Sequence, residues 1–356
     1  MKERRTSVKQ IGIITITGLG NYGNRLQNYA LQYAVEKYVG AHCETVINKS
    51  SRLKGYIKAI LFPRHGKVSR RELLFQNFNE EFVHFSDIKI NNIVRNRKLR
   101  KYDCLICGSD QIWNSDYPEN DRANFGYFFP NQKVISYAAS FGTNTVANSK
   151  KKRYAKYLKN LHSVSVREER GKLLAEDLSG RKDVYVHIDP TFLLSADEWT
   201  KVEKKPEQYI GGKYILKYFL GESNNELNQE LEKLAREKGL EIIDVISPDS
   251  PYYNIGPSEF LYLEHHAELI VTDSFHSCVF ALIFGRAFIV ADRKESSLKS
   301  MGSRIDTLLN LFDLNNRRYR PGKVGDLYLS AINYLSIQTI IEKEKKESIR
   351  YLLNSI

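Results

Sequence analysis

Short hydrophobic runs alternate with helical patterns along most of the chain. Residues 11–17 read as a buried strand, and residues 24–39 carry their apolar side chains on one helical stripe. The same alternation continues between residues 103 and 188 and starts again between 214 and 311. Strands that alternate with helices in this way are typical of parallel sheets. The pattern therefore predicts an α/β protein.

A polar stretch divides this pattern into two parts. Residues 198–212 include Pro206 and a glycine pair, and they interrupt the hydrophobic runs. We expect a Rossmann-like domain at 1–205, a second one at 206–335, and an amphipathic helix at 336–356 that could pack back on the first domain. Two doubly wound domains of this kind would face each other across a cleft, with ligands at the carboxyl ends of the strands.

The composition supports two cores and excludes a membrane-spanning helix. The 356 residues are 42% hydrophobic, yet no run of roughly 18 consecutive apolar residues occurs. Residues 1–10 are polar and basic, so no secretory signal is expected. Four cysteines are too few for a disulfide framework, and Cys104 and Cys107 would point to opposite faces of one strand. We therefore expect a cytoplasmic protein with core cysteines and no metal site.

The positive charge is concentrated in the first part of the chain. Residues 1–200 contain 33 Lys and Arg against 20 Asp and Glu, a net charge of +13, whereas residues 201–356 have 21 against 22, a net charge of −1. An excess of this size suggests an anionic partner, and a phosphorylated substrate, an anionic membrane and nucleic acid are the candidates. A solvated basic surface is the alternative. No nucleic-acid-binding motif is present, so nucleic acid is not expected.

A glycine-rich segment follows the first strand. Gly18, Gly20 and Gly23 fit the G-x-G-x-x-G template between a strand and a helix, where a phosphate can approach the helix N-terminus. A dinucleotide cofactor would also need a carboxylate at the end of the second strand, and residues 47–50 contain none. The segment favours an anion or sugar-phosphate loop, with a tight strand–helix turn as the alternative. Its amide side chains suit a hydroxyl-rich ligand; the candidates are Asn21, Asn24, Gln27 and Asn28.

Two more segments place polar side chains where strands end. Residues 108–110 form a turn that would put Asp110, Gln111 and Trp113 at a carboxyl edge, as expected for binding sugar hydroxyls and a sugar ring face; an Asx turn with a packed Trp113 is the alternative. Arg167 ends another strand and could bind an anion bidentately, or it could pair with a neighbouring glutamate on the surface. Asp189 precedes a proline and should lie near the same edge.

The last strand–helix junction in question spans residues 271–277. Asp273 or Ser274 is a candidate N-cap of the helix that follows, and the free amides of its first turn, including that of Ser277, would attract an anion. His276 would stand there as a hydrogen-bond donor or proton carrier. Separately, residues 54–71 interleave bases with apolar residues, as in a membrane-surface segment, although a solvated helix and loop would have the same composition.

Several of these segments together resemble the bacterial polysaccharide pyruvyl transferases. The resemblance rests on the order and spacing of residues 21–32, 108–114, 136–142, 166–168 with 189–193, and 256–260 with 272–276. It implies a two-domain fold like that of glycosyltransferase-B enzymes. It also implies transfer of a pyruvyl group from phosphoenolpyruvate to two hydroxyls of a glycan sugar, which forms a cyclic ketal.

The resemblance implies roles for the candidate residues. Arg167, Ser274, His276 and Ser277 would bind phosphoenolpyruvate, His276 would be the acid or a phosphate ligand, and Asp110, Asp189 or Asp273 would be the base. No cofactor other than this co-substrate is expected. The acceptor would be a lipid-linked or polymeric glycan, which implies a peripheral position at the inner face of the membrane. A nucleotide-sugar glycosyltransferase of the same shape is the alternative, and a non-catalytic nucleic-acid or membrane-binding module is a third.

Overall fold

The computed structural model describes residues 8–48, 69–90, 96–116, 122–292 and 302–356. Its N-terminal half is built on a parallel sheet with the strand order β3-β2-β1-β4-β5. The strands are β1 (Gln10–Ile14), β2 (His42–Asn48), β3 (Phe85–Ile90), β4 (Cys104–Cys107) and β5 (Val134–Ser136). The order reverses between β1 and β4, and doubly wound sheets bind their ligands at such a point.

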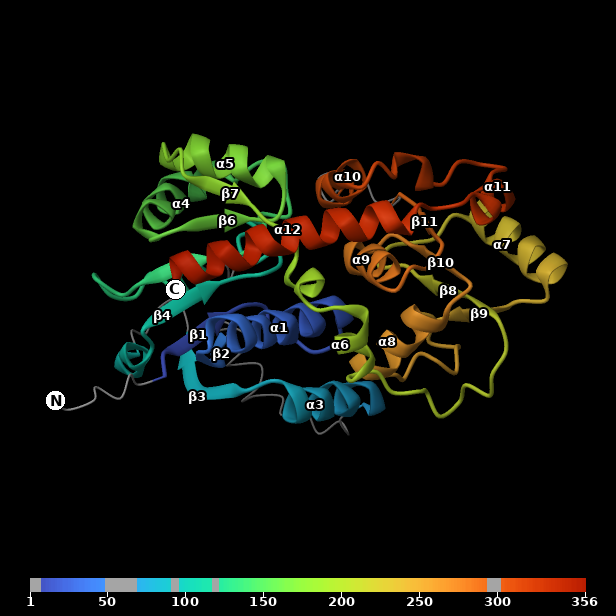
Figure 1. Ribbon diagram of the computed structural model, residues 1–356, viewed down its shortest axis with the longest axis horizontal. Coiled ribbons are helices and arrows are strands. Elements are labelled where there is room, and N and C mark those ends of the chain that lie inside the picture. Colours follow the sequence, from blue (N-terminus) through green and yellow to red (C-terminus); the bar gives the residue numbers. More distant parts are fainter. Residues whose placement is uncertain (1–7, 49–68, 91–95, 117–121, 293–301) are drawn as a thin grey trace.

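A smaller parallel pair extends this half. β6 (Val164–Val166) pairs with β7 (Val184–Val186), and an isolated bridge between Ile135 and Ser163 links the pair to β5. α4 (Asn148–Asn160) and α5 (Glu169–Ser179) pack against each other over this pair (Figure 1). Asp110, which follows β4, and Arg167, which follows β6, therefore lie along the same carboxyl-terminal side of the strands.

The C-terminal half has its own parallel sheet, with the order β11-β10-β8-β9. The strands are β8 (Tyr214–Tyr218), β9 (Glu241–Asp244), β10 (Leu269–Thr272) and β11 (Phe288–Val290). The two sheets lie side by side in Figure 1, and residues 187–213 connect them. This half also reverses its strand order, between β8 and β10.

Helices and short helical turns connect the strands. α1 (Tyr22–Ala34) follows β1 and continues into a π-helical turn, η1 (Val35–Val39). The other α-helices are α3 (Arg70–Phe82), α6 (Ala196–Thr200), α7 (Asn225–Lys238), α8 (Pro257–His266), α9 (Phe275–Ile283), α10 (Gly302–Leu311), α11 (Val324–Leu329) and α12 (Tyr334–Ser355). The 3-10 turns are η2 (Arg97–Lys101), η3 (Ala123–Phe125), η4 (Pro190–Leu193) and η6 (Asn315–Arg317).

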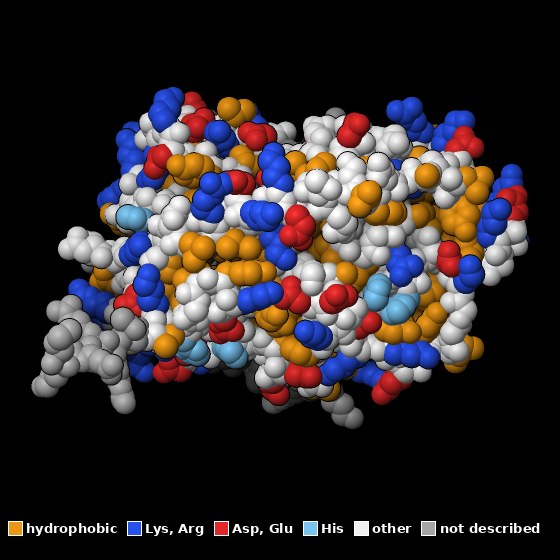
Figure 2. Space-filling view, viewed as in Figure 1, with side chains coloured by type: hydrophobic (Ala, Val, Ile, Leu, Met, Phe, Trp, Pro, Cys, Tyr) orange, Lys and Arg blue, Asp and Glu red, His pale blue; other side chains and the backbone are white. Residues whose placement is uncertain are grey.

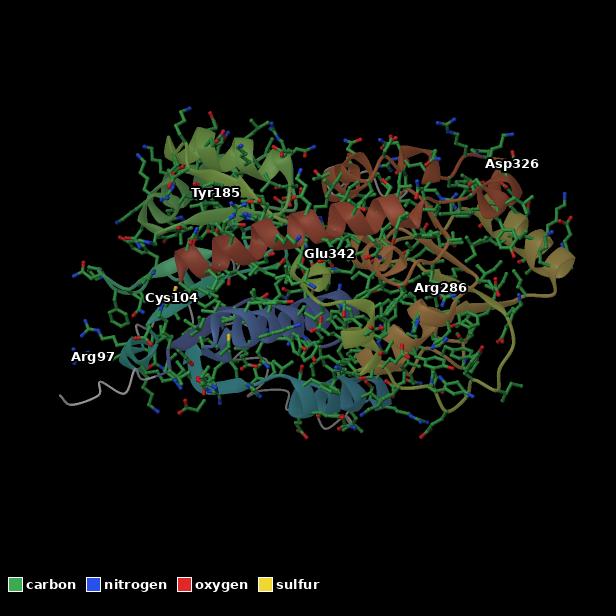
Figure 3. The ribbon with its side chains drawn as sticks, in the orientation of Figure 1. Arg97, Cys104, Tyr185, Arg286, Asp326 and Glu342 are labelled. Carbon is green, nitrogen blue, oxygen red and sulfur yellow. The ribbon has the colours of Figure 1, made fainter. Side chains whose placement is uncertain are left out.

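The C-terminal helix runs across both halves of the molecule (Figure 1). Near its end, the Tyr351 hydroxyl donates to the Ser136 carbonyl at 2.8 Å, and the Tyr351 ring packs on that of Tyr185 with centroids 5.8 Å apart. Figure 3 labels Tyr185 on β7, above the C-terminal part of α12 in this view. The carbonyl of Ile356 accepts hydrogen bonds from Lys9 and Lys133. The helix that starts beside the second sheet thus ends on the first.

Aromatic stacking joins the two halves at the start of α1. The Tyr22 ring stacks on Phe260 of α8 with centroids 4.3 Å apart and planes 3° from parallel. Its hydroxyl donates to the carbonyl of Ile255 at 3.3 Å. Arg71 of α3 lies over the Tyr22 ring at 4.8 Å and donates to the Tyr253 carbonyl at 3.2 Å. The halves therefore meet through buried contacts beside the carboxyl ends of β1 and β8.

The basic segment at 54–71 lies mostly outside the described residues. Its last two arginines begin α3, whose N-terminus is a capping box between Ser69 and Glu72. Arg71 is inserted between the halves, and Arg70 pairs with Glu207 at 2.6 Å. Both arginines thus take part in contacts with the C-terminal half, and the membrane-surface interpretation of the segment stays a prediction.

The four cysteines are core residues. All four cysteines lie in the described ranges and are buried and unpaired, and Cys104 and Cys107 belong to different hydrophobic clusters. The prediction that they occupy opposite faces of one strand is confirmed.

Basic side chains on the face shown in Figure 2 are scattered with acidic ones between them. Within the described residues, no helix is long and apolar enough to cross a bilayer.

Candidate active site

A cavity of about 250 Å³ lies where the two halves meet at the carboxyl ends of their strands. Both halves contribute to its wall. The N-terminal half contributes the start of α1 and the loop after β4, and the C-terminal half contributes the start of α9 and part of α10. The lining residues are Ile16, Asn21, Asn24, Asp110, Gln111, Leu220, Ser274, Phe275, His276 and Arg304. The cavity is therefore the cleft site that two doubly wound halves predict.

Two helix N-termini border the cavity. Asn21 caps α1 by accepting from the backbone amide of Asn24 at 3.1 Å, and Ser274 precedes the first residue of α9. Both first turns are fully described, and neither contains an acidic residue. Free amides and the helix dipoles therefore make this wall of the cavity attractive to anions.

His276 reaches from the second half toward a carboxylate of the first. Its Nε2 lies 3.6 Å from Oδ2 of Asp189, and no described residue forms a closer hydrogen bond with this nitrogen. The side chain is buried yet lines the cavity. An imidazole nitrogen in this position is available to a bound ligand.

Asp189 is held by a dense set of donors. Its Oδ1 accepts from the amide and hydroxyl of Thr191 at 3.1 and 2.7 Å, and its Oδ2 accepts from Arg167 at 2.6 Å. Burial alone would raise the pKa of Asp189, but His276 and Arg167 outweigh it and hold that pKa far below the ordinary value. Asp189 thus stays ionised, but its oxygens are used by Thr191 and Arg167 and it does not line the cavity, so it is poorly placed to accept a proton from a ligand.

Arg167 is enclosed between two carboxylates. It binds Asp189 at 2.6 Å and Asp110 at 3.1 Å, and its guanidinium lies 4.5 Å from the ring centre of Phe275. Its side chain is 1% exposed. Neither sequence-based interpretation describes this arrangement, since Arg167 neither lines the cavity nor forms a surface pair with a glutamate. The sequence could not show that two aspartates from distant loops would reach it.

Asp110 is the carboxylate that faces the cavity. Burial would raise its pKa, but Arg167, His276 and Arg304 together lower it. Its backbone has a φ of 75°, in the left-handed region, and this turns the chain directly after β4. The side chain therefore reaches the cavity wall in its ionised form, beside the start of α9.

Asp273 and Ser277 point away from the cavity. The Asp273 carboxylate accepts from the backbone amides of Leu220 and Gly221 at 2.7 and 2.9 Å, which closes the loop after β8. Ser277 donates to Oε1 of Glu264 at 2.6 Å, and burial raises the pKa of Glu264 well above its ordinary value. At this junction, only Ser274 and His276 among the predicted residues line the cavity.

The amide-rich segment is divided between the cavity and the core. Asn21 and Asn24 line the cavity as expected. Gln27 instead donates to Thr15 at 2.9 Å and accepts from the amide of Ser109, while Asn28 donates to Thr45 at 2.7 Å. These two amides connect α1 to β1, β2 and the loop after β4, so they position the site without facing a ligand there.

Gln111 and Trp113, which were predicted to bind the same sugar, lie in different surroundings. Gln111 lines the cavity, whereas Trp113 is fully buried and stacks on Phe125 with centroids 4.8 Å apart. The indole Nε1 donates to the Asn124 carbonyl at 3.2 Å. The packed-Trp alternative describes this residue, and the proposed stacking on a sugar ring does not.

Arginines that the sequence did not single out complete the site. Arg304 of α10 lines the cavity with its Nη1 3.8 Å from Oδ1 of Asp110, and its guanidinium lies beside the side-chain amide of Gln111. Arg25 lies buried behind the wall, where it donates to the carbonyl of Ile16, and burial lowers its pKa to about 10. Arg304 lies beyond every recognised motif, and no spacing rule would have connected it with Asp110.

Comparisons with known proteins agree with this architecture. A sequence model of the family "Polysaccharide pyruvyl transferase" matches residues 21–295. Among solved structures, UDP-GlcNAc 2-epimerase from Methanocaldococcus jannaschii is similar, with a TM-score of 0.52, 14% identity, and coverage of 94% of this chain and 92% of that one. A Listeria monocytogenes protein assigned as a UDP-N-acetylglucosamine 2-epimerase gives a TM-score of 0.50, 12% identity, and coverage of 94% and 95%. No curated protein sequence matches.

The solved structures support the fold, and the family model shows the family. At 12–14% identity, the two solved structures support the fold alone, a glycosyltransferase-B-like pair of parallel α/β halves. The family match runs from the start of α1 past β11, and so it includes both helix N-termini at the cavity. The chain belongs to the polysaccharide pyruvyl transferase family.

Proposed function

We propose that this chain transfers a pyruvyl group from phosphoenolpyruvate to two hydroxyls of a glycan sugar, and that the reaction takes place in the cavity between α1 and α9. Family membership supports the transfer to a polysaccharide. The observation that carries the finer proposal is the position of His276, whose free Nε2 lines an anion-attracting cavity 3.6 Å from an ionised aspartate.

The donor carries two anionic groups, a phosphate and a carboxylate. The first turn of α9 offers the backbone amides of Phe275 and His276, because the Ser274 amide already donates to Thr272 at 3.0 Å. Arg304 offers a planar guanidinium on the same cavity. We assign these two features to the two anions. Arg167 acts one step further away, because it holds Asp110 and Asp189 in place.

The chemistry needs one proton donor and one proton acceptor. A sugar oxygen attacks the central carbon of phosphoenolpyruvate while the terminal methylene carbon gains a proton and becomes a methyl group. The second hydroxyl then displaces phosphate from the same carbon, which leaves a ketal and inorganic phosphate. His276, which lines the cavity beside the ionised Asp189, suits the donor role. Asp110 suits the acceptor role, because it is ionised and faces the cavity.

The acceptor is expected to be a lipid-linked or polymeric glycan. Asn21, Asn24 and Gln111 line the cavity and can bind sugar hydroxyls through their amides. A lipid-linked acceptor would bring the enzyme to the inner face of the membrane. The basic excess in residues 1–200 supports this location by charge alone.

Mass spectrometry can test the proposal directly. The full chain is incubated with phosphoenolpyruvate and a panel of lipid-linked and polymeric glycans, and the products are searched for a pyruvate ketal with an equal amount of released phosphate. Thermal stabilisation by phosphoenolpyruvate is compared with that by nucleotide-sugars. Stabilisation by nucleotide-sugars alone, with no ketal product, would favour a nucleotide-sugar glycosyltransferase instead.

A further inference from the structure

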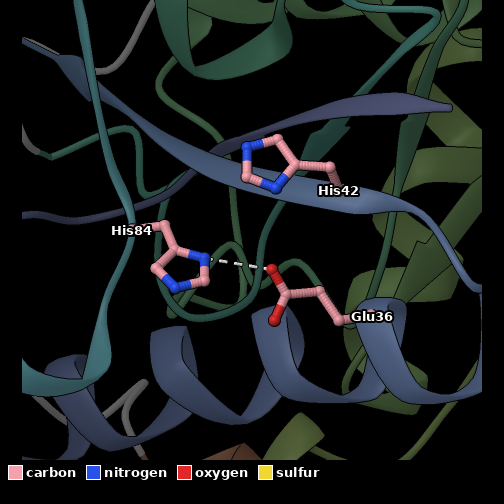
Figure 4. A group of neighbouring side chains, drawn as sticks. All are labelled: Glu36, His42 and His84. Atoms are coloured by element: carbon pink, nitrogen blue, oxygen red, sulfur yellow. Dashed lines mark hydrogen bonds and ion pairs between the residues drawn. The ribbon is translucent and has the colours of Figure 1, made fainter. Parts of the chain in front are cut away.

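Two histidines and a glutamate lie close together at the amino-terminal ends of β2 and β3, whereas the cavity lies at the carboxyl ends of the strands. Glu36 lies in η1, His42 is the first residue of β2, and His84 directly precedes β3. One donor atom from each of these residues lies within 4.8 Å of the other two. Nδ1 of His84 is 3.1 Å from Oε1 of Glu36, and the two imidazole rings are 6.0 Å apart (Figure 4). We call these three residues the His42–His84 cluster.

The local structure aims all three side chains at one point. The π-helical turn widens the end of α1 where Glu36 lies, and turns of this type are frequently found at functional sites. Paired parallel strands place the start of β2 beside the residue before β3, and the amide of Thr45 binds the His84 carbonyl at 2.7 Å. Three elements that are separate in the sequence are therefore fixed relative to one another.

The donor set has a definite chemical preference. Two imidazoles and one carboxylate are typical ligands of Zn²⁺, with water in an open fourth position. Zinc–ligand bonds of 2.0–2.1 Å place neighbouring ligand atoms about 3.3 Å apart in a tetrahedral site. The distance of 3.1 Å between His84 and Glu36 fits this spacing. Glu44 lies beside the cluster, with its Oε1 3.7 Å from Nε2 of His42, but its Oε2 is already bound by Lys101 and Tyr102, each at 2.7 Å.

We propose that the His42–His84 cluster binds a divalent transition-metal ion of the zinc type. The ion would join the end of α1 to the starts of β2 and β3, away from the catalytic cavity. Its role would therefore be structural, and the proposal is independent of the reaction assigned to the cavity. It also departs from the expectation of no metal site, which rested on the cysteine pair, on a reaction that requires no metal and on the lack of a metal-binding motif in the sequence.

A second group in the described part of the chain provides a matched control. Glu203, His265 and His266 also bring three donor atoms within 4.8 Å. Its contacts resemble those of the His42–His84 cluster, since the two oxygens of Glu203 lie 2.9 and 3.5 Å from the imidazoles of His265 and His266. Burial lowers the pKa of His266, and the charges of His265 and Arg286 lower it further. The positive charge of Arg286, which acts on His266, opposes the binding of a cation there.

The test measures metal binding without any reference to activity. The full chain is prepared without a histidine tag, stripped with a chelator and titrated with ZnCl₂ in a calorimeter. The double variant His42→Ala/His84→Ala is compared with His265→Ala/His266→Ala. We expect the first to weaken Zn²⁺ binding at least about tenfold, since even residues outside the coordination shell can cost that much. The second should retain the affinity of the parent.

Two further measurements make the result specific. Co²⁺ in place of Zn²⁺ should give visible absorption bands of a tetrahedral site in the parent and not in the first double variant. Circular dichroism in chelator checks that this variant folds, and the single variant His84→Gln replaces it if it does not. No Zn²⁺ binding by the parent, or unchanged affinity in the His42/His84 variant, would overturn the proposal.

Discussion

Gly23 and His276 come from opposite halves of the molecule and leave no space between them. A Cβ atom on Gly23 would lie 2.2 Å from Nδ1 of His276. Gly23 lies in the first turn of α1, and His276 lies in the first turn of α9. The two helix N-termini that border the cavity are thus in direct contact. The glycine is required for this approach, whatever the role of the neighbouring glycines.

Gly23→Ala should therefore separate the two halves at the cavity. Because a methyl group there has no room, we expect a loss of about 1–3 kcal/mol in the free energy of unfolding and a displaced His276. Turnover should fall even under conditions where the variant is fully folded, because His276 is displaced. Gly18→Ala is the matched control, because no atom lies within 4 Å of a Cβ at that position. Equal effects of the two substitutions on turnover would contradict the steric role.

His276→Ala should remove the proposed proton donor. General acid catalysis contributes about 10²–10⁴-fold to a rate, so turnover should fall by at least about 100-fold. His276→Gln retains a hydrogen-bond donor and should keep more of the affinity for phosphoenolpyruvate than the alanine variant keeps. Turnover numbers and calorimetric donor affinities check both. If both variants turn over like the parent, His276 is only a packing residue.

Arg304→Gln should weaken donor binding without unfolding the protein. A hydrogen bond to a charged group is worth about 1.5–3 kcal/mol, which corresponds to roughly a 10- to 150-fold rise in the dissociation constant for phosphoenolpyruvate. Calorimetric titration measures this change. Arg318→Gln serves as control, because Arg318 pairs with Asp292 at 2.8 Å and does not line the cavity. An unchanged affinity in Arg304→Gln would remove Arg304 from the donor site.

Arg167→Ala should damage folding as well as function, and the damage should depend on pH. Removing this arginine leaves two buried carboxylates without their partner, at a cost of about 3–5 kcal/mol. The folded-state pKa values of Asp110 and Asp189 are lowered in the parent, so their stabilisation is complete above about pH 4 and lost as the pH falls toward those values.

Urea unfolding between pH 2 and pH 7 measures this effect. The difference between parent and Arg167→Ala should be constant above about pH 4 and should shrink as the pH falls below it. Lys98→Ala is the control, because it removes an exposed ion pair with Asp87 and should change stability by at most about 1 kcal/mol. A difference that does not vary with pH would show that the buried carboxylates are not its source.

Trp113→Phe distinguishes a core residue from a sugar-stacking residue. The phenyl ring can keep the stacking on Phe125 but leaves the Asn124 carbonyl without its indole donor. We expect a loss of about 1–3 kcal/mol in stability and an unchanged KM for the glycan acceptor. Thermal unfolding and steady-state kinetics measure the two quantities. A large rise in the acceptor KM at unchanged stability would restore the stacking role.

The order of elements could be predicted from the sequence, because it depends on local patterns. Alternating hydrophobic runs and helical stripes gave both parallel sheets, and the spacing of the motifs gave the family. Strand alternation also placed Cys104 and Cys107 on opposite faces. The sequence analysis did not predict α3, although the helix has a capping box and buries Phe75 and Phe78. The basic residues around position 70 were interpreted by their charge and not by the helical pattern.

The contents of the cavity were decided by tertiary structure. Sequence patterns show which side chains stand where a strand ends, and they correctly brought Asn21, Asp110, Gln111 and His276 to the cavity. They do not show which of these side chains meets a partner from the other half or from a distant loop. Arg167 is enclosed by aspartates from two distant loops, Asp273 is used by backbone amides, and Arg304 arrives from a helix outside every motif. Such pairings depend on the packing of two halves against each other, and no local spacing encodes that packing.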